Sequence, residues 1–407
     1  MSGIRSKLGK GGVWWIAVGF FLLSLAPGLW MPSLPNVLHA RGIEWVLPYA
    51  FAVGPLAALF SPLIFGSMAD YRFSAQKLAG TLSLVGAGFL GMAFVALQMN
   101  WGPWAYLGFQ SLNALIAAPM WALLSTVTLA SVDGAQKKFP LFRVWGTVGW
   151  IMAGLMVSFL DWDSSPRAGM AAAGVRVLFG LVCFMMPETK PQGKPEQGKP
   201  GWRKYFGLDA LVLFKDPALR VFLLTSVCFA VPLAAFYMYA PIQLKELGDG
   251  HPTASMALGQ VTEIGAMLML AGLLAKGRLR WVLIAALSLG VARYGLFAYS
   301  GWTGSLPWLW LGIALHGPCY TFYFVTGQML VDRRVAPGMR SQAQALLGTM
   351  VGGIGGLLGS LLCGWYYGVT IDLVNGWVFF WGGLMVAVFG CAVYFINGYG
   401  RAPNGGA

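Results

Sequence analysis

Charged residues are scarce in this sequence. Only 10% of the 407 residues are Asp, Glu, Lys or Arg, and just 14 are acidic. A soluble domain usually carries about 25% charged residues, so a water-soluble globular fold is excluded. The three histidines are too scattered for a metal site, and the five cysteines form no CxxC pair. We therefore expect no metal, no cofactor and no disulfide, with the cysteines buried as small apolar side chains.

Sequence patterns typical of enzymes are also missing. The chain has no nucleophile elbow and no phosphate-binding loop. It also lacks a polar stretch long enough to fold into a catalytic domain. We predict that the protein is not an enzyme. A membrane enzyme or a scaffold is an alternative class, but no residue pattern supports it.

Long apolar runs dominate instead. Hydrophobic residues make up 57% of the chain, and twelve runs have the roughly 20 residues that a membrane-spanning helix needs. These runs predict an all-α membrane protein of twelve transmembrane helices in two six-helix halves, 1–186 and 218–407, joined by a cytoplasmic linker, 187–217. The first run follows Arg5, Lys7 and Lys10 but is too long for a signal peptide, so we expect a retained helix. The predicted spans are 13–34, 45–68, 77–98, 103–128, 139–160, 166–186, 218–243, 254–275, 280–299, 306–330, 341–363 and 375–397.

The distribution of basic residues predicts the orientation. If both termini are cytoplasmic, the outer loops hold only Arg41, Arg167 and Lys245, and two further arginines lie inside spans. The other 22 of the 27 Lys and Arg residues then face the cytoplasm, as the positive-inside rule requires. The net charge of +13 therefore reports topology, and nucleic-acid binding is not expected. We predict a multi-pass protein of the cell inner membrane, embedded in the lipid bilayer.

Glu263 is the one acidic residue predicted to lie deep in a span. Gln260, three residues earlier, shares its helical face. Charges in the hydrocarbon are costly and mark functional sites by default. A desolvated carboxyl group can take up and release a proton, and the pair can hydrogen-bond a polar solute. The alternative is a structural glutamate bonded to Arg293 or to another helix.

Two arginines, Arg176 and Arg293, are predicted well inside spans, and Arg143 is predicted about one turn inside the cytoplasmic end of the fifth span. Arg293 needs a buried partner, and it is a candidate for either a structural contact or proton coupling. Arg176 is similar. Arg143 and Thr147 share a face of the fifth span with Trp150 close by, which predicts a polar patch that lines a solute cavity. The alternative for Arg143 is an arginine that snorkels to the membrane surface.

Polar aromatic residues are concentrated in the seventh and tenth spans. Several hydroxyl groups in two spans of the second half predict a lined cavity, whereas each alone is ordinary packing material. Prolines interrupt the fourth and seventh spans, as they often do near transport sites. The residues are Tyr237, Tyr239, Tyr320, Thr321 and Tyr323, with Pro119 and Pro232.

The end of the second span carries a candidate conformational latch. Gly66 begins the string, and Asp70 and Arg72 follow at its cytoplasmic end. Small residues let two helices approach closely, and the carboxylate can then meet a helix N-terminus or a basic side chain. Such a contact can break and re-form as the halves move.

That string resembles the loop motif of the major facilitator superfamily, and the six-plus-six division agrees with it. A narrower resemblance is to the nucleoside:proton symporters within that superfamily. Four stretches carry it, with weaker similarity along most of the chain. They are Arg143-Val-Trp-Gly-Thr147-Val-Gly, Gln260-Val-Thr-Glu263, Ala292-Arg293-Tyr294-Gly295-Leu296-Phe297-Ala298-Tyr299, and 327–344 with Asp332 and the Arg340-Ser-Gln-Ala core.

The resemblance implies that Arg143, Thr147, Gln260 and Glu263 line the solute cavity, with Glu263 as the proton-linked group. It also implies a monomer. The chain departs from the pattern at three positions that contact the nucleoside. An aspartate is replaced by Thr321, and two amides by the residues at Ala234 and Tyr237.

These observations predict a secondary active transporter that carries a nucleoside or a similar small polar organic solute together with a proton, by alternating access. The three departures and the 18 tryptophans favour an alternative, an exporter or facilitator of a more apolar compound on the same fold.

Overall fold

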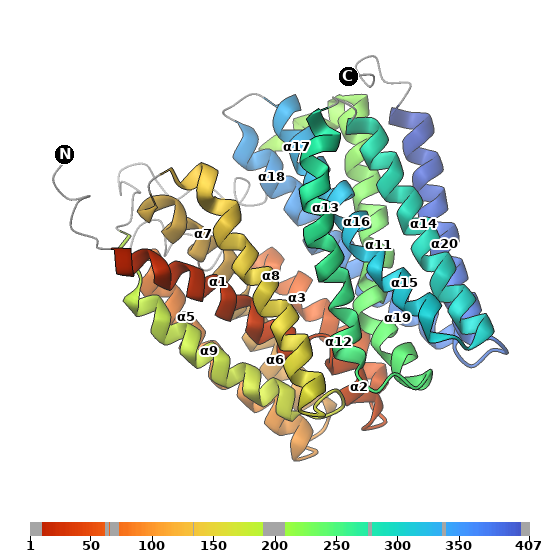
Figure 1. Cartoon of the computed structure of the whole chain (residues 1–407), viewed down its shortest axis with the longest axis horizontal. Helices are drawn as coiled ribbons and strands as arrows, with labels where there is room; N and C mark the ends of the chain where they lie inside the picture. The colour runs from red at the N-terminus through yellow and green to blue at the C-terminus, as the bar shows by residue number, and fades with distance from the viewer. Residues whose placement is uncertain are drawn as a thin grey trace. The chain divides into compact units, whose positions relative to one another are not determined.

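The computed structural model describes residues 10–61, 65, 73–132, 134–189, 208–275, 279–335 and 339–399. All regular structure in these ranges is helical (Figure 1). Helices suit an apolar chain in lipid, because each helix satisfies its own backbone hydrogen bonds. The first part of the chain forms α1 (Lys10–Trp30), α2 (Leu34–His39), η1 (Glu44–Val46), α3 (Leu47–Ser61), α5 (Ala75–Gln98), α6 (Pro103–Ala117), α7 (Met120–Ser131), α8 (Ala135–Phe159) and α9 (Arg167–Met185). The second forms η4 (Leu208–Lys215), α11 (Pro217–Glu246), α12 (Pro252–Met256), α13 (Leu258–Ala275), α14 (Leu279–Thr303), α15 (Leu306–Ala314), α16 (His316–Tyr320), η5 (Thr321–Val325), α17 (Thr326–Arg334), α18 (Arg340–Gly348), η7 (Thr349–Gly355), α19 (Gly356–Thr370) and α20 (Gly376–Tyr399).

Ten helical segments of the described chain have the length and hydropathy of a membrane span. The predicted eighth and tenth spans are also helical, as α13 and as the run from α15 to α17, although they are not among these ten. Pro119 divides the predicted fourth span into α6 and α7, whereas Pro232 lies inside the unbroken helix α11. The count of twelve spans stays a prediction.

The described chain divides into two compact units. The first comprises Met1–Arg41 and Leu56–Pro200, and the second comprises Gly42–Pro55 and Gly201–Ala407. The predicted division into 1–186, a linker at 187–217, and 218–407 places 42–55 in the first half, and it stays a prediction. The predicted latch residues Gly66, Asp70 and Arg72 lie outside the described residues.

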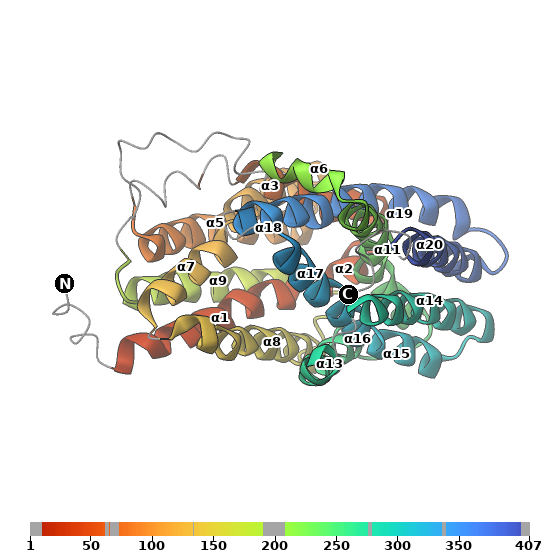
Figure 2. The ribbon, with the colours of Figure 1, turned by 90° about the horizontal axis from the view of Figure 1, so that it is seen from above.

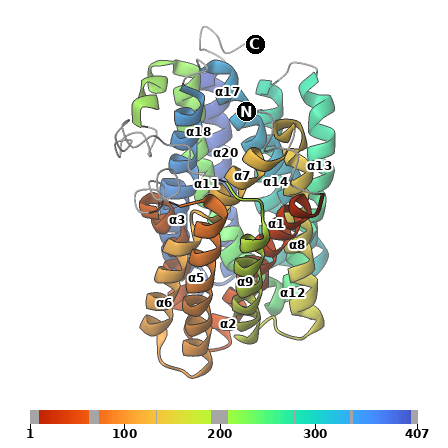
Figure 3. The ribbon, with the colours of Figure 1, turned by 90° about the vertical axis from the view of Figure 1, so that its left-hand side faces the viewer.

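Glycines set the packing of the first unit. α5 runs beside α9 (Figure 3), and α1 runs beside α8 (Figure 2). Gly80 on α5 faces Gly180 on α9, and a Cβ on either would lie within 3.2 Å of the other's carbonyl oxygen. Gly149 on α8 packs in the same way on the backbone of Phe21. Small residues allow this backbone contact, which in turn positions the arginines of α8 and α9.

Aromatic side chains fill the interior of the second unit, where α14 runs beside α20 (Figure 1). Trp381 is fully buried, and its ring centroid lies 4.9 Å from that of Phe297 and 5.9 Å from that of Tyr294. Tyr239 stacks on Tyr367 with 4.0 Å between ring centroids. Tyr239 is therefore a packing residue, although the sequence suggested a cavity lining.

All five cysteines are free thiols. Cys183, Cys319 and Cys363 are buried. Cys228 is exposed, so the prediction that the cysteines are all buried is wrong at that position. Hydropathy placed Cys228 within a span but did not show which face of the helix it occupies.

Candidate functional site

A chain of hydrogen bonds joins four helices of the second unit. Arg293 on α14 is completely buried, and its Nη1 lies 2.7 Å from Nδ1 of His316 on α16. Its Nη2 donates to the Tyr294 hydroxyl over 2.5 Å. That hydroxyl donates to the carbonyl oxygen of Pro232 in α11 over 2.6 Å. Arg293 therefore links α14 and α16 directly, and reaches α11 through Tyr294.

Aromatic faces complete the surroundings of this guanidinium. Its central carbon lies 5.0 Å from the ring centroid of Phe236 and 4.5 Å from that of Tyr294. Cation–π attraction at these distances stabilises a buried cation. Among the described residues, no carboxylate lies within ion-pair distance of Arg293. The alternative of a structural Glu263, bonded to Arg293 or to another helix, stays a prediction.

The hydrogen bond from Arg293 fixes the tautomer of His316. An arginine side chain only donates, so Nδ1 of His316 must accept. A neutral imidazole then carries its proton on Nε2, which lies 3.3 Å from the Tyr237 hydroxyl oxygen and donates to it. The ring also stacks on Phe236, with 4.3 Å between ring centroids. His316 is thus held from both sides in one orientation.

The Tyr237 hydroxyl, positioned by His316, in turn orients the side chain of Gln260. The Gln260 amide nitrogen donates to the Tyr237 hydroxyl over 3.3 Å, while its Oε1 atom has no hydrogen-bond partner among the described residues. A buried acceptor without a partner costs about 1–3 kcal/mol. The side chain is buried, so a ligand that donates an N–H or O–H to Oε1 would recover that free energy.

Glycines bring α13 and α16 into contact at this point. A Cβ on Gly317 would lie 2.2 Å from the backbone nitrogen of Glu263, and one on Gly259 would lie 3.2 Å from the His316 ring. Thr262 also donates to the Ala314 carbonyl over 2.6 Å. Glu263 is partly exposed and exerts an electrostatic effect on the Tyr237 hydroxyl. The helix crossing therefore gathers Gln260, Glu263, Tyr237 and His316.

His316 was not among the site residues predicted from the sequence. A histidine in the middle of a predicted apolar span was a usable signal, since an imidazole in lipid needs a partner. The scattering of the three histidines argued only against a metal site. It left open a hydrogen-bonding role whose partners come from distant helices.

The other residues predicted in the tenth span divide into two groups. Tyr320 is partly exposed, and its ring centroid lies 5.8 Å from that of His316, so it joins the cluster. Thr321 is completely buried at the start of the π-helical segment η5, with no partner for its hydroxyl. Tyr323 is also completely buried and shares a hydrogen bond with Ser226, as a packing residue would.

The three residues of the polar patch predicted on α8 lie in the first unit, and the patch itself stays a prediction. Arg143 is exposed, and its guanidinium carbon lies 6.0 Å from the ring centroid of Trp121 on α7. Thr147 and Trp150 are partly buried. A Cβ on Gly146 would lie 2.8 Å from Ser24 Oγ and 3.2 Å from Trp121, so α8 packs closely here.

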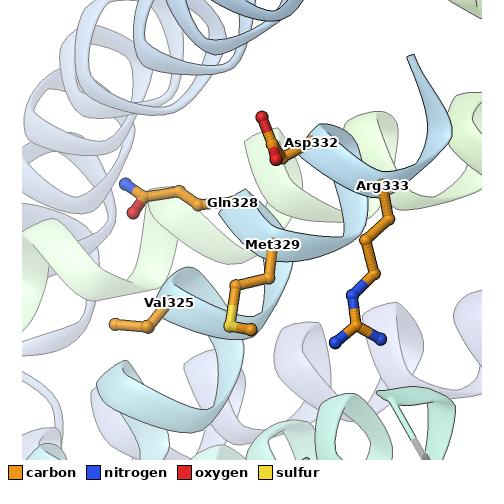
Figure 4. A pocket seen from close by; sticks show the side chains of 5 residues that line it. All are labelled: Val325, Gln328, Met329, Asp332 and Arg333. Carbon is orange, nitrogen blue, oxygen red and sulfur yellow. The ribbon is translucent and has the colours of Figure 1, made fainter. Parts of the chain in front are cut away.

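A surface hollow of about 260 Å³ lies along α17 (Figure 4). Gln328 and Asp332 line it together with Arg333. Asp332 pairs with Arg340 at 3.4 Å, and the Gln344 amide donates to the Gln328 carbonyl over 2.8 Å. These contacts tie α17 to α18, in the stretch 327–344 that carries part of the family resemblance.

Comparison with solved structures identifies the fold. The chain superposes on the nucleoside transporter NupG with a TM-score of 0.80 at 23% identity, covering 94% of this chain and 98% of that one. A mutant of NupG gives a TM-score of 0.86 at 22% identity, covering 95% and 99%. The chain therefore has the fold of the major facilitator transporters.

Sequence comparison identifies the family. A model of the nucleoside H⁺ symporters matches residues 16–399, so the chain belongs to that family. It is 36% identical to the putative nucleoside transporter YegT of Escherichia coli, over 92% of this chain and 90% of that one. It is 28% identical to the xanthosine permease of the same organism, over 89% of each chain. The predicted family resemblance is confirmed.

Proposed function

We propose that this protein moves a nucleoside across the inner membrane together with a proton, and that Glu263 is the group that carries the proton. The observation that supports this most strongly is the cluster on α13, in a chain of the nucleoside H⁺ symporter family. Glu263 lies there next to Gln260, whose oxygen lacks a partner. A carboxyl group and a free acceptor on one face suit a proton and a solute that bind together.

The proton affects transport through the conformational equilibrium. A proton on Glu263 shifts the balance between outward-open and inward-open states only if its affinity differs between them. Glu263 lies where α13 crosses α16, so a movement of either helix changes the surroundings of Glu263. Such a coupled change is what an alternating-access symporter needs.

The proposed solute contacts are given for each unit by itself. On the first unit they are Arg143, Thr147 and Trp150. On the second unit they are Gln260, Glu263, Tyr237, Tyr320 and Thr321. The ribose and base of a nucleoside offer both donors and acceptors, which these side chains can match. Arg293 acts in this scheme by positioning His316 and, through it, Tyr237. The latch at Gly66, Asp70 and Arg72 would stabilise one of the two states.

The proposed arrangement in the membrane follows the charge distribution. Both termini lie in the cytoplasm in this arrangement, since 22 basic residues then face inward. The protein works as a monomer, as the family resemblance implies. The proton and the solute are its only small-molecule partners.

An exporter or facilitator of a more apolar compound is the second candidate. The aromatic character of the cluster favours it. Phe236, Tyr237 and His316 contact one another there, and Tyr320 contacts His316. Efflux from loaded vesicles that nucleosides do not inhibit would support this candidate over the first.

Uptake of radiolabelled uridine and adenosine, at acid and neutral external pH, tests the proposal. We expect acid-stimulated uptake in the wild type and at least a tenfold loss in Glu263→Gln. The matched control is Glu246→Gln, at the exposed end of α11, which should retain wild-type uptake. Undiminished, pH-dependent accumulation by Glu263→Gln would refute the role of Glu263. Absence of nucleoside uptake by a well-expressed wild type would refute the substrate.

A further inference from the structure

The first unit contains a second buried cation. Arg176 on α9 is 7% exposed, and its Nη1 donates to the side-chain oxygen of Asn113 on α6. Asn113 in turn donates to Gln110 over 3.2 Å, which orients the amide. The second guanidinium nitrogen of Arg176, Nη2, is buried and has no hydrogen-bond partner in the part of the chain that the structure describes.

The charge of Arg176 has no counter-charge among the described residues, because no carboxylate of these residues lies within ion-pair distance of it. A buried charge without a counter-charge is costly, and a purely structural arginine usually satisfies its donors. Gly86 provides the space, because a Cβ there would lie 2.7 Å from Nη2. The absence of a side chain at Gly86 therefore leaves room for Nη2 of Arg176, the nitrogen that donates no hydrogen bond.

Arg176 lies at a cavity of about 220 Å³ within the first unit. Pockets that enclose a drug-sized ligand measure about 300–1,000 Å³, so this one suits a single ring system. Two indole rings, those of Trp30 and Trp121, lie among its walls, and Asn113 is its other polar side chain. Flat aromatic walls with a donor suit a planar ring that bears a hydrogen-bond acceptor.

Trp121 connects this cavity to the patch on α8. Its side chain is 42% exposed, it lines the cavity, and its ring lies under the Arg143 guanidinium at 6.0 Å. Arg143 is one of the proposed solute contacts. The indole ring of Trp121 therefore lies between a solute bound at Arg143 and the cavity that Arg176 lines.

We propose that Arg176 and Asn113 form a base subsite that selects nucleosides with a ring carbonyl over those with an amino group at the same position. This inference rests on the proposed function. An arginine donates to two acceptors, such as O6 and N7 of a 6-oxopurine. Adenine instead carries an amino group, a hydrogen-bond donor, at its 6-position, and an amide side chain pairs better with that edge. With Nη1 used by Asn113, Nη2 donates to the carbonyl oxygen.

Inosine and adenosine provide a matched test, because they differ only by a 6-oxo or a 6-amino group. Unlabelled inosine and adenosine compete with radiolabelled uridine for uptake, and the ratio of their half-inhibitory concentrations is the measurement. We expect inosine to inhibit the wild type at a concentration about tenfold lower, which lies within the roughly 5- to 150-fold discrimination of an arginine–base pair. In Arg176→Gln the ratio should fall to about one or reverse.

Two further variants separate recognition from folding. Arg167→Gln, an exposed arginine at the start of the same helix, should keep the wild-type ratio. Ala117→Leu narrows the cavity but leaves the guanidinium in place, and it should raise the half-inhibitory concentration of inosine about tenfold. Equal inhibition by both nucleosides in the wild type, or an unchanged ratio in Arg176→Gln, would overturn the subsite and leave nucleoside transport standing. A wild type that takes up no nucleoside would refute the proposed function and the subsite with it.

Discussion

At the scale of the residue, the hydrogen bond between Arg293 and His316 has the largest consequences. It holds a buried cation, fixes an imidazole tautomer and, through Tyr237, orients Gln260. Each bond depends on the one before it, since a donor that moves leaves its acceptor unpaired. The stability of this cluster and its solute contact are therefore coupled.

His316→Phe tests that coupling. The phenyl ring keeps the stacking on Phe236 but leaves Nη1 of Arg293 buried without an acceptor. We expect a loss of about 3 kcal/mol in folding stability, because an unpaired buried donor on a charged group is costly. The apparent melting temperature of the purified protein measures it, and uptake should fall as well.

The double variant His316→Phe with Arg293→Met is the control. Methionine removes the charge and needs no hydrogen-bond acceptor, so most of the lost melting temperature should return. Uptake should stay low, because Tyr237 still lacks its donor. A single variant that melts like the wild type would show that the Arg293–His316 bond contributes little.

At the scale of the element, close helix approaches depend on individual glycines. Gly169 on α9 faces Phe94 on α5, and a Cβ there would lie 2.1 Å from the ring. Phe94 is completely buried, with ring centroids 6.0 Å from both Trp30 and Tyr106, so it cannot move aside. Gly169→Ala should cost about 1–3 kcal/mol through overpacking, measured as a lower melting temperature.

Gly174→Ala, on the same helix, is the matched control. No atom lies within 4 Å of its added Cβ, and alanine is the better helix former by about 1 kcal/mol. Its melting temperature should stay the same or rise. Equal destabilisation by both substitutions would contradict the assignment of Gly169 to the α5–α9 contact.

Hydropathy predicted the helices well, because lipid leaves a spanning chain few alternatives. Pattern alone also placed Gln260 and Glu263 on one face. It did not reveal the partners of Arg293, because His316 is 23 residues away and meets it only through tertiary packing. Nor did the sequence show how far a polar residue of a predicted span is exposed: Thr321 is completely buried.

At the scale of the whole molecule, the distribution of 27 basic residues predicts where each loop lies. A reporter that is active only outside the cytoplasm, such as alkaline phosphatase, should be inactive when fused at the C-terminus. It should be active when inserted after Gly250, in the predicted outer loop that follows α11. The reverse pattern would mean that the basic loops face outward.

Proton-driven accumulation of a nucleoside is the central claim, and reconstituted vesicles measure it most directly. An inward proton gradient imposed on vesicles that contain the purified protein should concentrate radiolabelled uridine above its external level. A protonophore should abolish that accumulation, and Glu263→Gln should only equilibrate the solute or move none. Uridine that never exceeds its external concentration in wild-type vesicles, or accumulation that a protonophore leaves intact, would contradict the account.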